Sequence, residues 1–325
     1  MRSEDVSWAL GDTIVEATIA APNDPGTYPG VVLVAGSGPT DRNWESPLLP
    51  GTNGSGRLLA ETLAASGYVT LRYDKRASGP HAVQNMTMLA GSVSLESHFD
   101  ELRSAVSRLQ SHPDVDSAHV FALTSSEGAI HALYYQSHAG VTPFAGMILT
   151  GAPGRAISEV AGTQVLSQLA LMPGSEDLIA RYDALVRRFE EDLTFAPDAK
   201  LPEFVNNLVG SLSAPVNQPF SRELWSFSAA DHLRNVSAPV LIVIGKKDIQ
   251  VDWRLDGGAL EAAAQGKSRI SFFYPENANH VLKHQRTPQS ELSPAIAMSN
   301  YNAPEANLDA ETLETIQNWL QKHSG

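Results

Sequence analysis

The sequence contains no cysteine, and this absence alone removes several kinds of chemistry. A chain without thiols forms no disulfides, has no thiolate nucleophile and holds no cysteine-ligated zinc. Basic residues are also in deficit, because 23 lysines and arginines face 36 aspartates and glutamates, for a net charge of −13. Without a basic stripe, we expect neither nucleic acid nor an anionic membrane as a partner.

Long hydrophobic runs are missing as well. No apolar stretch approaches the roughly 18 residues that a membrane-spanning helix needs. The charged start, Met1–Asp5, lacks the apolar core of a signal peptide. We therefore expect a soluble, cytoplasmic protein, although a chain trimmed at its N-terminus would start in the same way. The composition leaves homo-oligomerisation open.

The chain does contain a regular alternation of strand-like and helix-like patterns. Residues 6–10 and 15–19 alternate apolar and polar side chains, which is typical of an antiparallel hairpin. The pattern predicts an α/β fold with a mostly parallel, doubly wound, eight-stranded sheet and helices on both faces. The six further strands are expected at residues 31–35, 68–73, 120–123, 147–150, 239–245 and 270–274, with amphipathic helices between them.

One segment breaks this alternation. Residues 154–237 contain no convincing strand but carry two helical apolar stripes. We interpret residues 1–153 and 238–325 as the core and residues 154–237 as a helical lid over the carboxyl ends of the strands. The alternative is that these helices pack on the sheet edge. Residues 285–307 form an irregular stretch too long for a simple connection, and we expect it to line a site.

A serine occupies the short turn between the strand-like run at 120–123 and the next helix. A serine on a sharp strand-to-helix turn projects from the sheet, and the following backbone lies near a helix N-terminus. Gly128, two residues after Ser126, allows the helix to pack close to the strand. Thr124 stands where a second glycine is usual, so we expect a small local shift there, with Ser126 still in a strained backbone conformation.

An acid and a histidine are predicted to reach the same sheet edge, because ligands bind outside the carboxyl ends of parallel strands. Ser126, Asp248 and His280 each follow a predicted strand, in the chain order Ser, Asp, His. Asp252 competes with Asp248, which we prefer because it closely follows its strand. Ser125 competes with Ser126, but it would put large side chains at the small-residue positions of the turn.

These motifs resemble the α/β-hydrolase superfamily, and within it the bacterial dienelactone-hydrolase-like or esterase-like serine hydrolases. The branch usually has a histidine at the position of Ala35. The resemblance covers nearly the whole chain and is specific for fold and nucleophile, not for substrate. The segments that carry it are Gly36–Arg42, Arg72–Arg76, Ser126–Gly128 and Asp248–Val251.

The resemblance implies a role for each residue of a catalytic triad. Ser126 would be the nucleophile, His280 its base and then the acid to the leaving group, and Asp248 the group that orients the imidazole. The backbone N–H groups of Ser37 and Glu127 would meet the negative charge that develops on the substrate oxygen. The candidate substrate-binding residues are Gly38, Arg76 and Trp225.

Two other clusters receive plainer interpretations. Asp41, Arg42, Arg72, Asp74 and Arg76 are interpreted as two loops tied by ion pairs, with binding of an anionic substrate as the alternative. His280 and His284 have a spacing seen in metal sites, but no glutamate follows the first histidine and no third ligand is evident. We therefore expect neither a metal nor another cofactor.

The sequence predicts a serine hydrolase that cleaves a carboxylic ester of a small, moderately apolar substrate through an acyl-enzyme. The same triad acting on a thioester, amide, lactone or carbon–carbon bond is the first alternative, because fold does not decide the bond. A non-catalytic binding protein on a hydrolase scaffold is the second.

Overall fold

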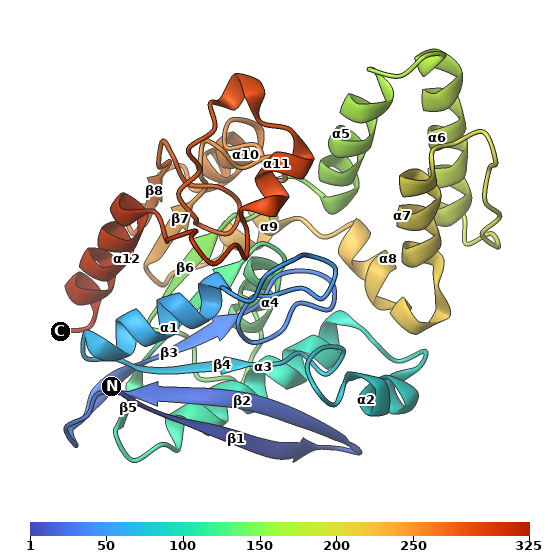
Figure 1. The fold of residues 1–325 in the computed structure, drawn as a ribbon. Helices are drawn as coiled ribbons and strands as arrows, with labels where there is room; N and C mark the ends of the chain where they lie inside the picture. Colours follow the sequence, from blue (N-terminus) through green and yellow to red (C-terminus); the bar gives the residue numbers. More distant parts are fainter.

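The structure is a computed structural model that describes residues 1–325, and it contains one eight-stranded sheet (Figure 1). The strands are β1 (Arg2–Leu10), β2 (Thr13–Ala21), β3 (Tyr28–Val34), β4 (Val69–Tyr73), β5 (Val115–Ser125), β6 (Gly146–Thr150), β7 (Val240–Val243) and β8 (Ile270–Phe273). Their order in the sheet is β1-β2-β4-β3-β5-β6-β7-β8. β2 pairs antiparallel with β1 and β4, and every other pair is parallel, which confirms the predicted fold class.

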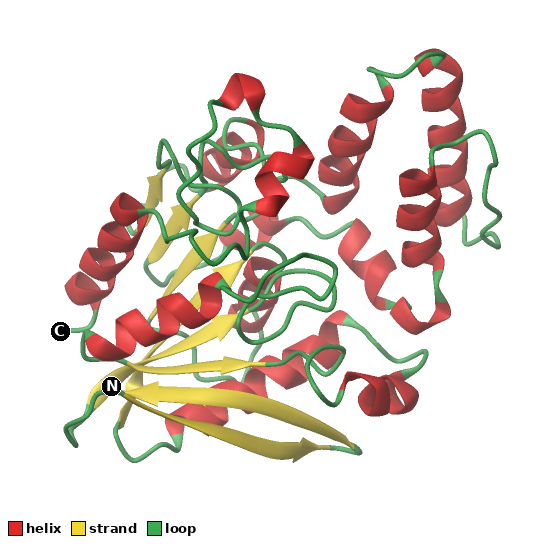
Figure 2. Ribbon diagram, in the orientation of Figure 1, coloured by secondary structure: helices red, strands yellow, loops and turns green.

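Helices cover both faces of the sheet (Figure 2). The α-helices are α1 (Ser55–Ala65), α2 (Ala82–Leu89), α3 (Leu95–Gln110), α4 (Gly128–Gln136), α5 (Ile157–Leu169), α6 (Ser175–Glu190), α7 (Glu203–Ser213), α8 (Phe220–Trp225), α9 (Ala229–Leu233), α10 (Leu255–Ala263), α11 (Pro294–Ser299) and α12 (Ala310–His323). None of them is long and apolar enough to cross a membrane.

The two faces form two separate hydrophobic clusters. Val31 and Leu33 pack into the cluster with α1 and α12, whereas Val32 and Val34 pack into the cluster with α3, α4, α9 and α10. Successive side chains of a strand point to opposite faces, so a strand buried on both sides is apolar throughout. The continuous apolar run at 31–35 is therefore explained by its central place in the sheet.

Helices α5 to α8 have a hydrophobic cluster of their own, away from the sheet (Figure 1). Leu169 of α5, Tyr182 of α6, Val205 of α7 and Trp225 of α8 all belong to it. The two predicted apolar stripes, which fall on α6 and α7, thus pack into this cluster. The division of the chain into a core and a lid stays a prediction.

The structure departs from the sequence-based expectation in two elements. The hairpin is longer than predicted, since residues 2–5 of β1 also pair with β2. These residues are all exposed and show no apolar alternation, so no pattern marks them as a strand. Helix α2 was not predicted, since only Asn85 and Leu89 of its eight residues are buried and no apolar stripe marks it.

Candidate active site

Ser126 lies at the carboxyl end of β5 in a backbone conformation that few residues adopt. Its φ is +53°, and only three other non-glycine residues in the chain have positive φ. Its N–H donates to the carbonyl of Thr150 at 2.8 Å, which fixes the turn against β6. A Cβ added at Gly128 would lie 2.5 Å from the carbonyl oxygen of Val34, so only glycine lets α4 start this close to β3. The strained turn expected for Ser126 is present.

Thr124 is accommodated differently from our expectation. We predicted a small local shift, but β5 stays in register with β3 and β6 through Thr124. The side chain is fully buried, and its hydroxyl donates to the carbonyl of Ile148 at 3.3 Å. A β-branched residue fits here because it is an ordinary member of a central strand.

Asp248 and His280 form a buried hydrogen-bonded pair. Nδ1 of His280 lies 2.7 Å from Oδ2 of Asp248, and because a carboxylate only accepts, Nδ1 carries the hydrogen. Oδ1 of Asp248 accepts from the backbone N–H groups of Gln250 and Val251 at 2.8 and 3.0 Å. The carboxylate is thus held by three donors, and Nε2 of His280 has no partner within the protein.

The competing candidates have other partners. Asp252 accepts from the backbone N–H groups of Arg254 and Leu255, so its carboxylate holds the turn that precedes α10. His284 contacts Asp309, with 3.0 Å between Nδ1 and Oδ2, and makes no contact with His280. The structure contains no group of three side chains suited to hold a metal ion.

Ser126 and His280 line the same cavity of about 290 Å³. The Ser126 hydroxyl makes no hydrogen bond to the imidazole here, and catalytic hydrogen bonds are often long before substrate binds. The remaining lining residues come from two loops: Gly36, Ser37, Gly38, Pro39, Thr40, Trp44, Ser46, Leu48 and Leu49 from the first, and Val281, Met298, Tyr301 and Asn302 from the second, together with Ser125 and Gln250. As expected, the irregular stretch at 285–307 lines the site, whereas α5 to α8 contribute no residue.

Two backbone donors near the nucleophile turn have no acceptors of their own. The N–H groups of Ser37 and Glu127 make no hydrogen bond within the protein. β3 and β5 are neighbours, so the loop after β3 and the turn after β5 lie side by side. A Cβ added at Gly36 would lie 3.3 Å from that of Ser126, which shows how closely the two segments approach.

A buried ionic network lies behind the turn. The Glu127 carboxylate accepts from Lys75 at 3.4 Å and from His131 at 3.2 Å. Burial acts to raise the pKa of Glu127, but Lys75 and His131 together hold this pKa well below its ordinary range. Burial also lowers the pKa of His131. The charges under the nucleophile turn are therefore paired rather than free.

Of the three substrate-binding candidates, only Gly38 lines the cavity. Arg76 is buried away from it, where its Nε donates to Glu101 at 2.8 Å. Trp225 packs in the cluster of α5 to α8, and its Nε1 donates to Glu190 at 3.0 Å. Neither Arg76 nor Trp225 therefore lines the cavity as expected. Arg76 forms a structural ion pair, and Trp225 belongs to the core of the helical segment.

The charged loops do tie to one another. Asp74 accepts from the backbone N–H of Arg42 at 2.7 Å and lies 3.7 Å from its guanidinium. Arg72 donates to Asn43 at 3.0 Å. Burial raises the pKa of Asp74 to about 6. This agrees with the interpretation of two loops linked by polar contacts.

Residues that sequence reasoning missed include Trp44, Leu48 and Tyr301, all of which line the cavity. They stand in irregular loops, where no periodic pattern marks an inward-facing side chain. Trp44 has a φ of +64°, another strained position beside the cavity. Only the length of the second loop signalled a role for this part of the chain.

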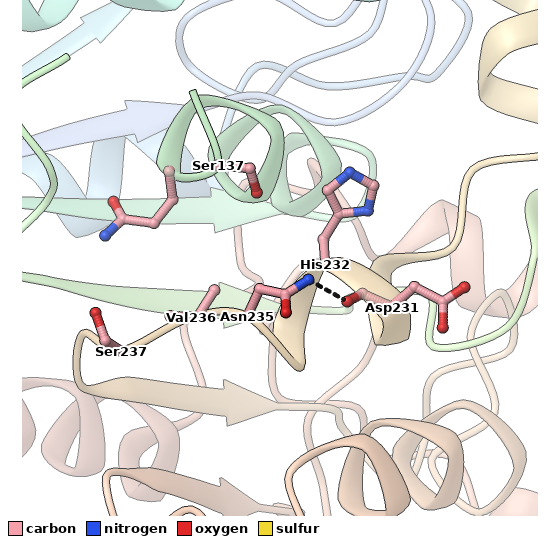
Figure 3. Close-up of a pocket in the computed structure, with 7 residues that line it drawn as sticks. Ser137, Asp231, His232, Asn235, Val236 and Ser237 are labelled. Carbon is pink, nitrogen blue, oxygen red and sulfur yellow. Dashed lines mark hydrogen bonds between the residues drawn. The ribbon is translucent and has the colours of Figure 1, made fainter. Parts of the chain in front are cut away.

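A second hollow, of about 440 Å³, lies at the opposite edge of the sheet, between the end of α4 and the segment after α9 (Figure 3). Its lining includes Ser137, Ser237 and His232, and the first and last of these already have partners. Ser137 donates to the carbonyl of Leu133 at 2.8 Å, and Nδ1 of His232 lies 3.1 Å from the carbonyl of Ser228. This hollow contains no pair that resembles Asp248 and His280.

The chain was compared with known protein families, sequences and structures. No family model matches the chain. It is 25% identical over 306 residues to the esterase EstD of Thermotoga maritima, covering 94% of this chain and 65% of that protein, so the chain spans just under two thirds of its relative.

Solved structures show the same fold. The Pyrococcus furiosus esterase Pf2001 has a TM-score of 0.58 and 16% identity, covering 100% of this chain and 92% of that one. The proline iminopeptidase of Mycobacterium smegmatis has a TM-score of 0.56 and 14% identity, covering 98% of both chains. By its sheet topology and these likenesses, the chain has the α/β-hydrolase fold, and its sequence is similar to that of an esterase.

Proposed function

We propose that this protein is a serine hydrolase that cleaves a carboxylic ester through an acyl-enzyme. The observation that carries the proposal is the buried Asp248–His280 pair, whose free Nε2 belongs to a histidine lining the same cavity as the strained Ser126. A hydroxyl attacks poorly until a base accepts its proton, and an imidazole held in one tautomer by a carboxylate is such a base. The sequence similarity to an esterase favours an ester over the other bonds.

The reaction proceeds in two steps. Nε2 of His280 takes the Ser126 proton as Oγ bonds to the ester carbonyl carbon, and the imidazolium then protonates the departing alcohol. Water, deprotonated by the same nitrogen, next attacks the acyl carbon; the bond from that carbon to Ser126 Oγ breaks, the imidazolium returns its proton to Oγ, and the acid is released. In both steps the N–H groups of Ser37 and Glu127 donate to the oxyanion.

The cavity indicates the size and polarity of the substrate. A volume of about 290 Å³ suits a small acyl or alcohol group. Leu48, Leu49 and Met298 give it an apolar wall, and Gln250 and Asn302 add polar groups. We therefore assign selection of the substrate to the two loops. The helical segment at 154–237 contributes no residue to the cavity.

A panel of p-nitrophenyl esters of increasing acyl length tests this proposal, run beside the matching anilides and thioesters. We expect turnover of short esters by the wild type and at least a thousandfold loss in Ser126→Ala. Faster turnover of anilides or thioesters would move the proposal to the alternative bond. Absence of turnover for every ester would contradict it.

A further inference from the structure

We propose that Lys75 is a positioning residue for the oxyanion hole, because its one buried ammonium binds the two segments that carry both backbone donors. The inference rests on the proposed function and extends it to a residue outside the triad. Lys75 does not line the cavity, so it acts through other groups and does not touch the substrate.

The sheet topology explains how one lysine reaches both segments. β4, β3 and β5 are consecutive in the sheet, and Lys75 lies in the loop after β4. Its side chain extends past the end of β3 to the turn after β5. The residue is 3% exposed, and its Nζ has two partners: the carbonyl of Gly36 and the carboxylate of Glu127.

The bond to Gly36 acts on the first donor. The Gly36 carbonyl and the Ser37 N–H belong to the same peptide group, which is trans because the chain's one cis bond is Gln218–Pro219. In a planar trans peptide the C=O and the N–H point in opposite directions. An ammonium that holds the carbonyl from behind therefore fixes where the Ser37 N–H points. It also polarises the peptide, which makes that N–H a stronger donor.

The bond to Glu127 acts on the second donor. Glu127 directly follows the nucleophile and carries the second N–H. The carboxylate of Glu127 lies 3.4 Å from Nζ of Lys75. His131 holds the same carboxylate oxygen at 3.2 Å, from the first turn of α4. Both donor segments are thus joined to one ammonium, which sets their separation. The positive and negative charges offset one another, so no unpaired charge is buried.

Lys75→Met tests the inference, since methionine retains most of the side-chain volume and cannot donate. Loss of one direct oxyanion donor costs about 10²–10³ in kcat. We expect weakening of two donors by Lys75→Met to lower kcat/KM about 10- to 100-fold, mainly through kcat.

A pair of inhibitors separates positioning from a merely structural role. A trifluoromethyl ketone adds Ser126 to give an anionic adduct that needs the oxyanion hole, whereas the matching methyl ketone binds as a neutral carbonyl. We expect Lys75→Met to weaken binding of the trifluoromethyl ketone by about the same factor as it lowers kcat/KM. Binding of the methyl ketone should not change. Equal weakening of both inhibitors, or of neither, would overturn the inference.

Two further variants keep the test decisive. Arg155→Met removes a half-buried cation, which lies 2.9 Å from Asp256, and we expect lower stability with unchanged kcat/KM. If Lys75→Met does not fold, the double variant Lys75→Met/Glu127→Gln removes both charges and is compared with Glu127→Gln alone. We expect the double variant to be at least tenfold slower than Glu127→Gln; equal kcat/KM values would refute the role of Lys75.

Wild-type turnover distinguishes the two proposals. If the wild type hydrolyses esters and Lys75→Met equals it in kcat/KM, only the role of Lys75 fails. If the wild type hydrolyses no ester, the proposed function fails and the inference falls with it.

Discussion

Replacing Gly128 with alanine tests the packing that holds the nucleophile turn. The added Cβ would lie 2.5 Å from the carbonyl oxygen of Val34 and 2.8 Å from that of Ala35. Ordinary contact begins near 3.4 Å, so α4 and the end of β3 must separate by about 0.9 Å. Both oxygens belong to the backbone, so no side chain can rotate to make room.

This displacement acts where the two proposed oxyanion donors meet. Glu127 precedes Gly128, and Ser37 follows the displaced end of β3. A misplacement of about 1 Å can cost about a hundredfold in rate, so we expect kcat/KM to fall by about 10- to 100-fold. Overpacking of this kind costs about 1–3 kcal/mol in the free energy of unfolding.

The assay measures ester turnover and urea unfolding of Gly128→Ala beside a matched control. Gly258 lies within α10, and a Cβ added there would meet nothing within 4 Å. Gly258→Ala is expected to raise the unfolding free energy by about 0.5–1 kcal/mol and to leave kcat/KM unchanged. Full activity and stability in Gly128→Ala would refute the reasoning, because the tight contact would then not constrain the turn.

Three further predictions follow from the same contacts. Asp248→Asn should lower kcat by about 10³–10⁴. Asp252→Ala should cost about 1 kcal/mol of stability through the two lost hydrogen bonds and leave kcat within about twofold. The reverse pattern in steady-state kinetics would reassign the acid. Burial acts to raise the pKa of Glu101, but His98 and Arg76 lower it from 4.5 to about 2. Its contribution to stability is therefore present above pH 4.5 and lost as pH falls toward 2. The wild type should lose about 1 kcal/mol more than Glu101→Gln between pH 5.5 and 3.5 in urea titrations. If the unfolding free energy of the wild type and of Glu101→Gln changed equally with pH, the contacts of Glu101 with His98 and Arg76 would not contribute to acid sensitivity. Burial lowers the pKa of Lys283 from 10.5 to about 8, and its Nζ, fully buried, donates to the carbonyl of Ala306 at 2.9 Å. The unfolded chain binds the extra proton between these values, so wild-type stability should rise by about 2 kcal/mol from pH 7 to 9.5 relative to Lys283→Met, and a parallel pH dependence would contradict this.

Apolar patterns in the sequence predicted the strands and helices whose side chains are buried at a regular spacing. The central parallel strands were found because they are buried on both faces, as Val31 to Val34 show by alternating between two clusters. The start of β1 and helix α2 were missed because their residues are mostly exposed and carry no apolar period. Chain order and strand ends likewise predicted that Ser126 and His280 would share one edge, and the structure places both at one cavity.

Side-chain partners could not be predicted in the same way. Arg76 and Trp225 follow the right kinds of segment, but their orientation depends on Glu101 and Glu190, which lie 25 and 35 residues away in the sequence. The cavity wall at Leu48 and Tyr301 is built by irregular loops. Lys75 shows the same limit, since its two partners become neighbours only through the order of β4, β3 and β5.

The most direct measurement of the central claim is covalent labelling of the nucleophile. The protein is incubated with a fluorophosphonate probe and the modified residue is located by mass spectrometry. We expect one label on Ser126, slower labelling in His280→Ala and none in Ser126→Ala. A label on another serine, or ester turnover that persists in Ser126→Ala without any label, would contradict the account.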